Sequence, residues 1–142
     1  MKIVLDTNVL VSGLLSPYGA PGRIVQMIVA GRIALCYDAR IVCEYREVLL
    51  RPELPFVPQQ VEALLEQIRA TGEPVAAAPL PVALPDPDDA PFLEVAVAGG
   101  ARYLVTGNPR HLPAASRRGV EVVSPADFVE SIRLDEGHLP SA

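Results

Sequence analysis

The sequence predicts an α/β protein, a three-layer α/β/α sandwich with a mostly parallel central sheet. Short apolar runs that suit buried strands alternate with longer segments whose apolar residues recur at helical spacing. Oxygen-bearing side chains follow several of these runs directly or open the next helix. Since ligands bind at the carboxyl ends of the strands in such sheets, these side chains are expected to gather in one crevice.

The first strand is predicted at residues 3–5, where Ile-Val-Leu forms an uninterrupted apolar run. Asp6 ends the run, with Thr7 and Asn8 directly behind it and a short helix predicted over residues 8–15. A carboxylate flanked by a hydroxyl and an amide can coordinate a hard cation through oxygen. The same residue types also cap helices, so both roles stay open at this point.

A second helix is predicted to end at Gly31, and a second strand follows over residues 33–37. Asp38 then caps a helix that runs to about residue 51, where a proline forbids continuation. Glu44 lies at the margin of the apolar face of this helix. A carboxylate at the edge of a core costs free energy unless it is paired, and either an arginine or a metal ion would pair it.

A further helix ends near Gly72 and leads into residues 73–85, a proline-rich linker with at most a short edge strand around residues 75–77. Neither side of the linker looks self-sufficient, so it is not expected to separate two domains. Residues 1–133 are therefore assigned to one domain, and residues 134–142 to a flexible tail.

Three acids precede the next helix: Asp86, Asp88 and Asp89. Pro91 fits only the first turn of a helix, which favours Asp88 as the N-cap. Asp89 stands three and four positions before apolar residues of the buried face, so it lies over that face. Favourable interaction with the helix dipole is a sufficient explanation for Asp86 and Asp88, whereas the direction of Asp89 also suits a cation site.

The third strand is predicted at residues 103–105, and Thr106 and Asn108 follow it, which repeats the design of the first strand. Asn108 stands before a proline, so a capping role and a ligand role are both open. A last strand is predicted around residues 120–123, with a final helix starting at Ser124.

Net charge, hydropathy and cysteine content limit the kinds of partner and location that the protein is expected to have. The net charge of −5 argues against a broad basic surface for nucleic acid, although bound cations would let phosphate approach an acidic site. No apolar stretch is long enough to span a membrane, and the protein is expected to be cytoplasmic, with no membrane partner. Cys36 and Cys43 make neither a disulfide framework nor a zinc motif, and both are expected to be reduced and at least partly buried.

Asp6, Glu44 and Asp89 come from three remote segments and would meet in the predicted crevice. Close carboxylates repel one another unless a cation or protons intervene. Mg²⁺ or Mn²⁺, held by a few carboxylates and several waters, suits such a site.

Four segments carry a resemblance to a known family. They are the opening Ile-Val-Leu-Asp-Thr-Asn-Val-Leu, the Glu-Tyr-Arg-Glu-Val-Leu that begins at Glu44, Asp-Pro-Asp-Asp-x-x-Phe-Leu-x-x-Ala, and Leu-Val-Thr-Gly-Asn. In this order and spacing, over roughly residues 1–130, they resemble the PIN-domain family, most closely the VapC-like toxins of bacterial toxin–antitoxin pairs. The resemblance implies a Mg²⁺- or Mn²⁺-dependent endoribonuclease, usually a homodimer and often silenced by a cognate antitoxin protein.

Carried over to this chain, the family's acidic positions fall on Asp6, Glu44 and Asp89, which would bind the metal and activate water for attack on RNA. Supporting polar roles would fall on Thr7, Asn8, Asp88 and Thr106. The family commonly has a fourth acid where this chain has Asn108, which keeps an oxygen ligand but removes a charge. Affinity for a second cation should then fall, unless Asp86 or Asp88 substitutes, or this copy is weakened.

Unpaired RNA is the expected substrate, because its backbone can bend into a crevice. The candidate phosphate contacts are Arg23, Arg110, Arg117 and Arg118, for which an exposed, solubilising role is the alternative. A phosphoaspartate enzyme or receiver domain is disfavoured, because no second acid follows Asp6 directly and Lys2 is the only lysine. A weakened PIN scaffold that binds a partner without cleaving RNA stays open because of Asn108.

Overall fold

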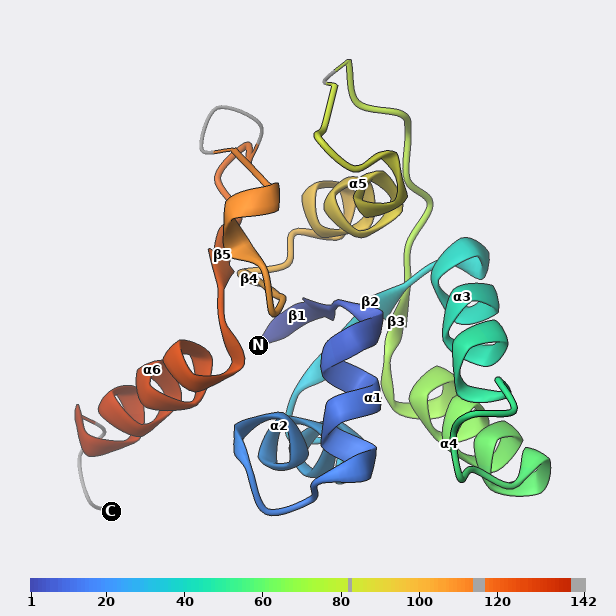
Figure 1. Ribbon diagram of the computed structural model, residues 1–142. Coiled ribbons are helices and arrows are strands. Elements are labelled where there is room, and N and C mark those ends of the chain that lie inside the picture. The colour runs from blue at the N-terminus through green and yellow to red at the C-terminus, as the bar shows by residue number, and fades with distance from the viewer. Residues whose placement is uncertain (82, 114–116, 139–142) are drawn as a thin grey trace.

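The computed structural model describes residues 1–81, 83–113 and 117–138. Its centre is a five-stranded sheet in the order β3-β2-β1-β4-β5. All four strand pairings are parallel. Helices lie on both faces of this sheet (Figure 1), which confirms the predicted three-layer α/β/α class.

The elements follow one another as β1 (Lys2–Leu5), α1 (Thr7–Leu15), α2 (Ala20–Val29), β2 (Ala34–Tyr37), α3 (Ala39–Leu49), α4 (Pro58–Thr71), β3 (Glu73–Pro74), α5 (Ala90–Gly99), β4 (Tyr103–Val105), β5 (Glu121–Val123) and α6 (Pro125–His138). The short 3₁₀ helix η1 (Pro87–Asp89) precedes α5, and η2 (Pro109–His111) follows β4. None of the helices in the described part of the chain has the length and apolar character needed to cross a membrane.

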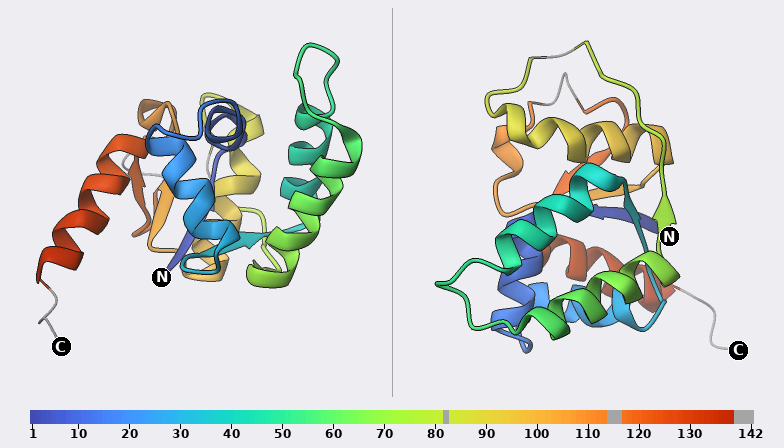
Figure 2. Two further views of the ribbon diagram at one scale, coloured as in Figure 1. Left: turned by 90° about the horizontal axis from the view of Figure 1, so that it is seen from below. Right: turned by 90° about the vertical axis from the view of Figure 1, so that its right-hand side faces the viewer.

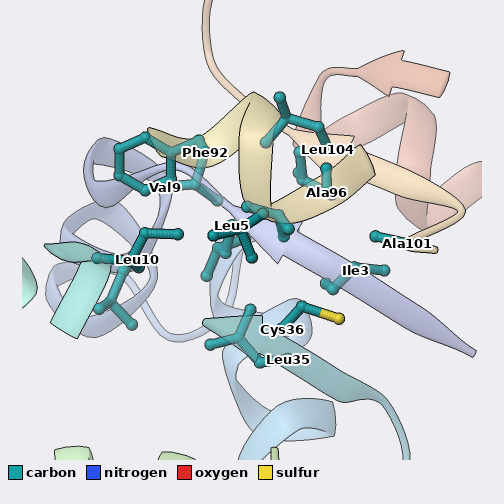
Figure 3. Close-up of a cluster of buried hydrophobic side chains, with 14 of the residues drawn as sticks. Ile3, Leu5, Val9, Leu10, Leu35, Cys36, Phe92, Ala96, Ala101 and Leu104 are labelled. Carbon is teal, nitrogen blue, oxygen red and sulfur yellow. The ribbon is translucent and has the colours of Figure 1, made fainter. Parts of the chain in front are cut away.

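The core forms around β1, the central strand. Helix α5 covers one face of the sheet and α1, α2 and α6 lie on the other, while α3 and α4 run side by side near the β2–β3 edge (Figures 1 and 2). Ile3 and Leu5 are fully buried between these layers. Figure 3 shows them among Leu10 of α1 and Phe92 of α5. The apolar run at the start of the chain is therefore a strand buried on both faces.

Two local expectations were wrong. The edge strand is Glu73–Pro74 and not residues 75–77, because Glu73 pairs in parallel with Cys36 of β2. Pro74 is tolerated there because β3 is an edge strand, with no further strand beside it in the described part of the chain. The capping side chain of this segment is Asp86 and not Asp88, since the Asp86 carboxylate accepts the N–H of Asp88 at 2.9 Å and so begins η1. Helix α5 itself starts after Asp89, whose side chain makes no capping bond among the described residues.

Two further differences concern exposure and length. Cys36 is buried in β2 as expected, but Cys43 is exposed on α3, because it lies on the side of the helix away from the core. Helix α6 continues to His138, so residues 134–138 are helical where a tail was expected. Residues 139–142 lie outside the described part of the chain.

Candidate active site

Asp6 directly follows β1, and Thr106 directly follows the neighbouring strand β4. Leu5 of β1 is in register with Val105 of β4, so the residues that follow them stand side by side. Thr106 Oγ1 donates to Asp6 Oδ2 at 2.8 Å. Among the described residues, the Asp6 side chain makes no capping bond to α1, and the helix instead begins on the Asp6 carbonyl oxygen. The Asp6 carboxylate is thus held by Thr106, which follows β4. The interpretation that the Asp6 side chain caps α1 is wrong.

Glu44 is held by Thr7, the residue that follows Asp6. The hydroxyl of Thr7, a buried residue at the start of α1, donates to Glu44 Oε2. The next residue on α3, Tyr45, is fully buried and donates its hydroxyl to the Leu5 carbonyl at 2.5 Å. These two bonds fasten α3 to the carboxyl end of β1, so Glu44 faces the same crevice as Asp6.

No arginine pairs with Glu44 in the part of the chain that the structure describes. The arginines of α3 and its end pair elsewhere: Arg40 with Glu94 at 2.7 Å, Arg46 with Glu62 at 2.7 Å, and Arg51 with Glu47 at 3.9 Å. Burial raises the pKa of Glu44, the hydrogen bond from Thr7 lowers it, and the charge of Asp6 raises it further. Pairing with an arginine therefore does not explain this half-buried carboxylate.

Asp89 contributes a carboxylate oxygen without a partner. Its Oδ2 atom is buried and accepts no hydrogen bond from any described residue. Burial, followed by the negative charges of Asp6 and Asp86, raises the pKa of Asp89 to about 6, against a weaker opposing effect of His111. Buried polar atoms in folded proteins almost always have a partner, so this one requires an explanation.

One cleft of about 240 Å³ is lined by the three carboxylates and by the two threonines that hold Asp6 and Glu44. The residues that the sequence assigned to the site and that line it are Asp6, Thr7, Asn8, Glu44, Asp86, Asp88, Asp89, Thr106 and Asn108. Four of them, Asn8, Asp86, Asp88 and Asn108, are exposed to solvent. The structure therefore brings together segments that begin 38 and 83 residues after Asp6 in the chain.

Arg51 and His111 also line the cleft, although the sequence had not marked them as site residues. Arg51 lies seven positions after Glu44, the spacing that returns to one face of a helix, and this signal was available in the sequence. His111 lies in η2, and its position depends on how the chain turns after Asn108, which no periodicity reveals.

None of the four arginines proposed as phosphate contacts lines this cleft. Arg117 is a structural residue, donating to the carbonyls of Leu112 at 2.7 Å and Pro109 at 2.9 Å. Arg110 and Arg118 are exposed. Arg23 lines a larger cavity of about 440 Å³ between α2 and α6, which holds none of the acidic site residues.

The oxygen atoms that line the cleft are of the types that bind a hard cation. Carboxylate, hydroxyl and amide oxygens are the ligands that Mg²⁺ and Mn²⁺ prefer, and the unpartnered Asp89 Oδ2 is an oxygen that a cation would satisfy. As the side chains stand, however, no three His, Cys, Asp or Glu residues of the described ranges are close enough to hold one ion together. Mg²⁺ typically takes one or two carboxylates and several waters, so three direct carboxylate ligands are not required here.

Comparisons with known proteins are consistent with this arrangement. The family model described as "PIN domain" matches residues 2–110. A solved structure described as VapBC2 from Rickettsia felis bound to a DNA fragment from their promoter is similar with a TM-score of 0.58 and 13% sequence identity, over 87% of this chain and 98% of the matched one. At that identity the similarity concerns the fold alone. No curated protein matches the chain.

Proposed function

This chain belongs to the PIN-domain family, and from that membership we propose that it is a metal-dependent endoribonuclease and the toxin of a toxin–antitoxin pair. PIN domains are generally nucleases, which gives the reaction class. One observation supports the proposal above all others. Asp6, Glu44 and Asp89, from three remote segments, line one cleft at the carboxyl end of the central strand.

The residues that would hold Mg²⁺ or Mn²⁺ are Asp6, Glu44 and Asp89, with the amide oxygen of Asn108 as a weaker donor. A divalent cation supplies a water of lowered pKa and offsets negative charge on the phosphate oxygens. Asn108 replaces a carboxylate by a neutral group, so the proposal requires one tightly held ion rather than two.

The chain's own residues orient this chemistry. Thr106 fixes one oxygen of Asp6, and Thr7 fixes Oε2 of Glu44. In this proposal Oε1 of Glu44 accepts the proton of the attacking water. The water oxygen forms the new bond to phosphorus as the bond to the ribose oxygen breaks, and that leaving oxygen takes up a proton from solvent. The raised pKa of Glu44 makes it a better proton acceptor than an ordinary surface carboxylate.

Substrate and partners follow the same proposal. An unpaired RNA strand is the proposed substrate, because an unpaired backbone can bend into a cleft at the carboxyl ends of the strands. An antitoxin is the proposed protein partner, and the similarity in fold to a VapBC2 structure supports it. A homodimer remains part of the proposal and rests on the family resemblance, whereas the cytoplasmic location stays a prediction from the sequence.

The experiment is a cleavage assay on RNA with Mg²⁺, Mn²⁺ or EDTA. The wild-type protein should cut only with metal, and Asp6→Asn should abolish cutting while the fold is retained. Asp127→Asn, which removes an exposed acid of α6 that does not line the cleft, is the matched control and should cut normally. If purified Asp6→Asn cuts at the wild-type rate, the assigned site is wrong.

A weakened PIN scaffold that binds without cleaving is the second candidate. The observations that favour it are Asn108 in place of an acid and the carboxylates that stand apart without a ready-made ligand set. It predicts no cleavage with either metal, together with binding of a partner that EDTA does not change.

A further inference from the structure

The cleft carries more negative charge than one cation can neutralise. Among the described residues that line it are five carboxylates and a single arginine. One divalent cation would still leave the cleft with a net charge of about −2 when the carboxylates are ionised and histidine is neutral. An RNA strand adds one negative charge per phosphate, so its approach needs further positive or hydrogen-bond-donating groups.

Arg51 and His111 line the cleft from segments that follow the two neighbours of β1. Arg51 follows α3, which enters from β2, and His111 ends η2, which follows β4. In the sheet, β2 and β4 are the two neighbours of β1. A strand of RNA that crosses the carboxyl end of β1 from the α3 side to the η2 side would therefore meet Arg51, then the carboxylates, then His111.

The guanidinium of Arg51 is available for such a contact. Among the described residues it forms an ion pair with Glu47 that is long at 3.9 Å, and the two side chains are 50% and 74% exposed. Exposed pairs of this kind contribute little free energy, so a phosphate can replace Glu47 at small cost. His111 is also exposed and lies near enough to Asp89 for their charges to interact.

We infer that Arg51 and His111 form two phosphate-binding positions, one on each side of the carboxylates, for the phosphates that flank the scissile phosphate in one RNA strand. The inference rests on the proposed nuclease function and adds the path of the substrate. It makes the preferred substrate a single strand that carries a phosphate on both sides of the cut. A dinucleotide with one phosphate would lack both contacts.

The test measures binding of a short single-stranded RNA by fluorescence anisotropy, with Ca²⁺ in place of Mg²⁺ so that binding is read separately from cleavage. The protein variants are Arg51→Ala and His111→Ala. The control is Arg133→Ala, which removes an arginine of α6 with an equally long exposed ion pair, 4.0 Å to Glu130, outside the cleft. Melting curves confirm that each variant is folded.

Arg51→Ala should weaken binding about tenfold, as expected for a lost charged hydrogen bond. The dependence of log affinity on log salt should become shallower by about 0.7, the value for one phosphate contact on a single strand. Arg133→Ala should change neither quantity. A merely structural role of Arg51 would lower the melting temperature without changing the salt slope.

A second series replaces one flanking phosphate at a time by an uncharged methylphosphonate. One such replacement should weaken wild type about tenfold but leave Arg51→Ala unaffected, and replacement on the other flank should do the same for His111→Ala. If the losses simply add for both flanks, or if wild type does not bind RNA, the inference is overturned. Cleavage by wild type with Mg²⁺ would in that case leave the nuclease proposal standing.

Discussion

The hydroxyl of Thr106 donates a 2.8 Å hydrogen bond to the carboxylate of Asp6, which lies 100 positions earlier in the chain. The same hydroxyl accepts the backbone N–H of Asn108 at 3.2 Å. The side chain of Thr106 therefore connects Asp6, the first acid of the cleft, with Asn108, which stands where the family commonly has a fourth acid. The connection is possible because β1 and β4 are adjacent parallel strands in register.

Thr106→Val should lower both stability and metal affinity. The substitution keeps the shape of the buried side chain but leaves Asp6 and the Asn108 N–H without this partner, at a cost of about 1–2 kcal/mol. For a chain of this size that is a fall of roughly 2–8 °C in melting temperature. Differential scanning calorimetry checks the value, and Thr106→Ser, which retains the hydroxyl, should recover most of the loss. Equal melting temperatures for Val and Thr would show that the bond contributes nothing.

Asn108→Asp should lower the Mg²⁺ concentration needed for half-maximal cleavage, because it restores a charge at the edge of the cleft. The capping alternative predicts no change, since Asn and Asp cap about equally well. The Asn108 side chain makes no capping hydrogen bond in the described part of the structure. Asn108→Ala should accordingly melt close to wild type, whereas loss of a true cap would cost about 1 kcal/mol. Metal titrations that superimpose would count against the ligand role.

Asp89→Asn should stabilise the metal-free protein at neutral pH. The folded protein holds the pKa of Asp89 at about 6, above the ordinary value of 3.8. Between these values the native state binds more protons than the unfolded state, so stability falls as pH rises through that window. The destabilisation is complete above about pH 6 and absent below about pH 4.

In EDTA, melting curves of Asp89→Asn should therefore lie above wild type at pH 7.5 and coincide with it near pH 4. Glu66→Gln, which changes an exposed acid of α4, is the control and should track wild type at both values. A constant difference between Asp89→Asn and wild type across the pH range would mean that the carboxylate is not destabilised by its surroundings.

Magnesium should raise the melting temperature of wild type by binding only the folded form. For about 10 mM Mg²⁺ and a dissociation constant of about 1 mM, linkage gives roughly 1.4 kcal/mol. That corresponds to a rise of roughly 3–6 °C for a chain of this size. Asp6→Asn should gain much less, because it loses a ligand. An equal response of the two proteins would remove Asp6 from the metal site.

Local patterns predicted much of this fold because the strands are short, apolar and buried on both faces. The run at Ile3–Leu5 and the polar residues behind it needed no knowledge of the rest of the chain. Asp38 as a cap was equally readable, and its carboxylate does accept the Ile41 N–H at 3.0 Å. These features depend on neighbours in sequence, which periodicity and capping preferences describe well.

Features set by distant partners were predicted less well. The edge strand begins at Glu73 because it pairs with Cys36 of β2, and the side chain of Glu73 pairs with Lys2 at 3.0 Å. The distances between Asp6, Glu44 and Asp89 depend on how α3 and α5 pack against the sheet, which no spacing along the chain encodes. Arg51 could have been found from its helical spacing to Glu44, whereas the place of His111 in the cleft depends on a turn after β4.

The sheet order has a consequence for the protein while it is being synthesised. β1 is made first, but its neighbour β4 begins only at Tyr103, and the hydroxyl that orients Asp6 belongs to Thr106. A nascent chain that has emerged only as far as α4 has Asp6 and Glu44 but neither Asp89 nor the strand that closes the sheet around β1. The ribosome that makes this chain is thus not exposed to a completed cleft until about three quarters of the residues have been joined.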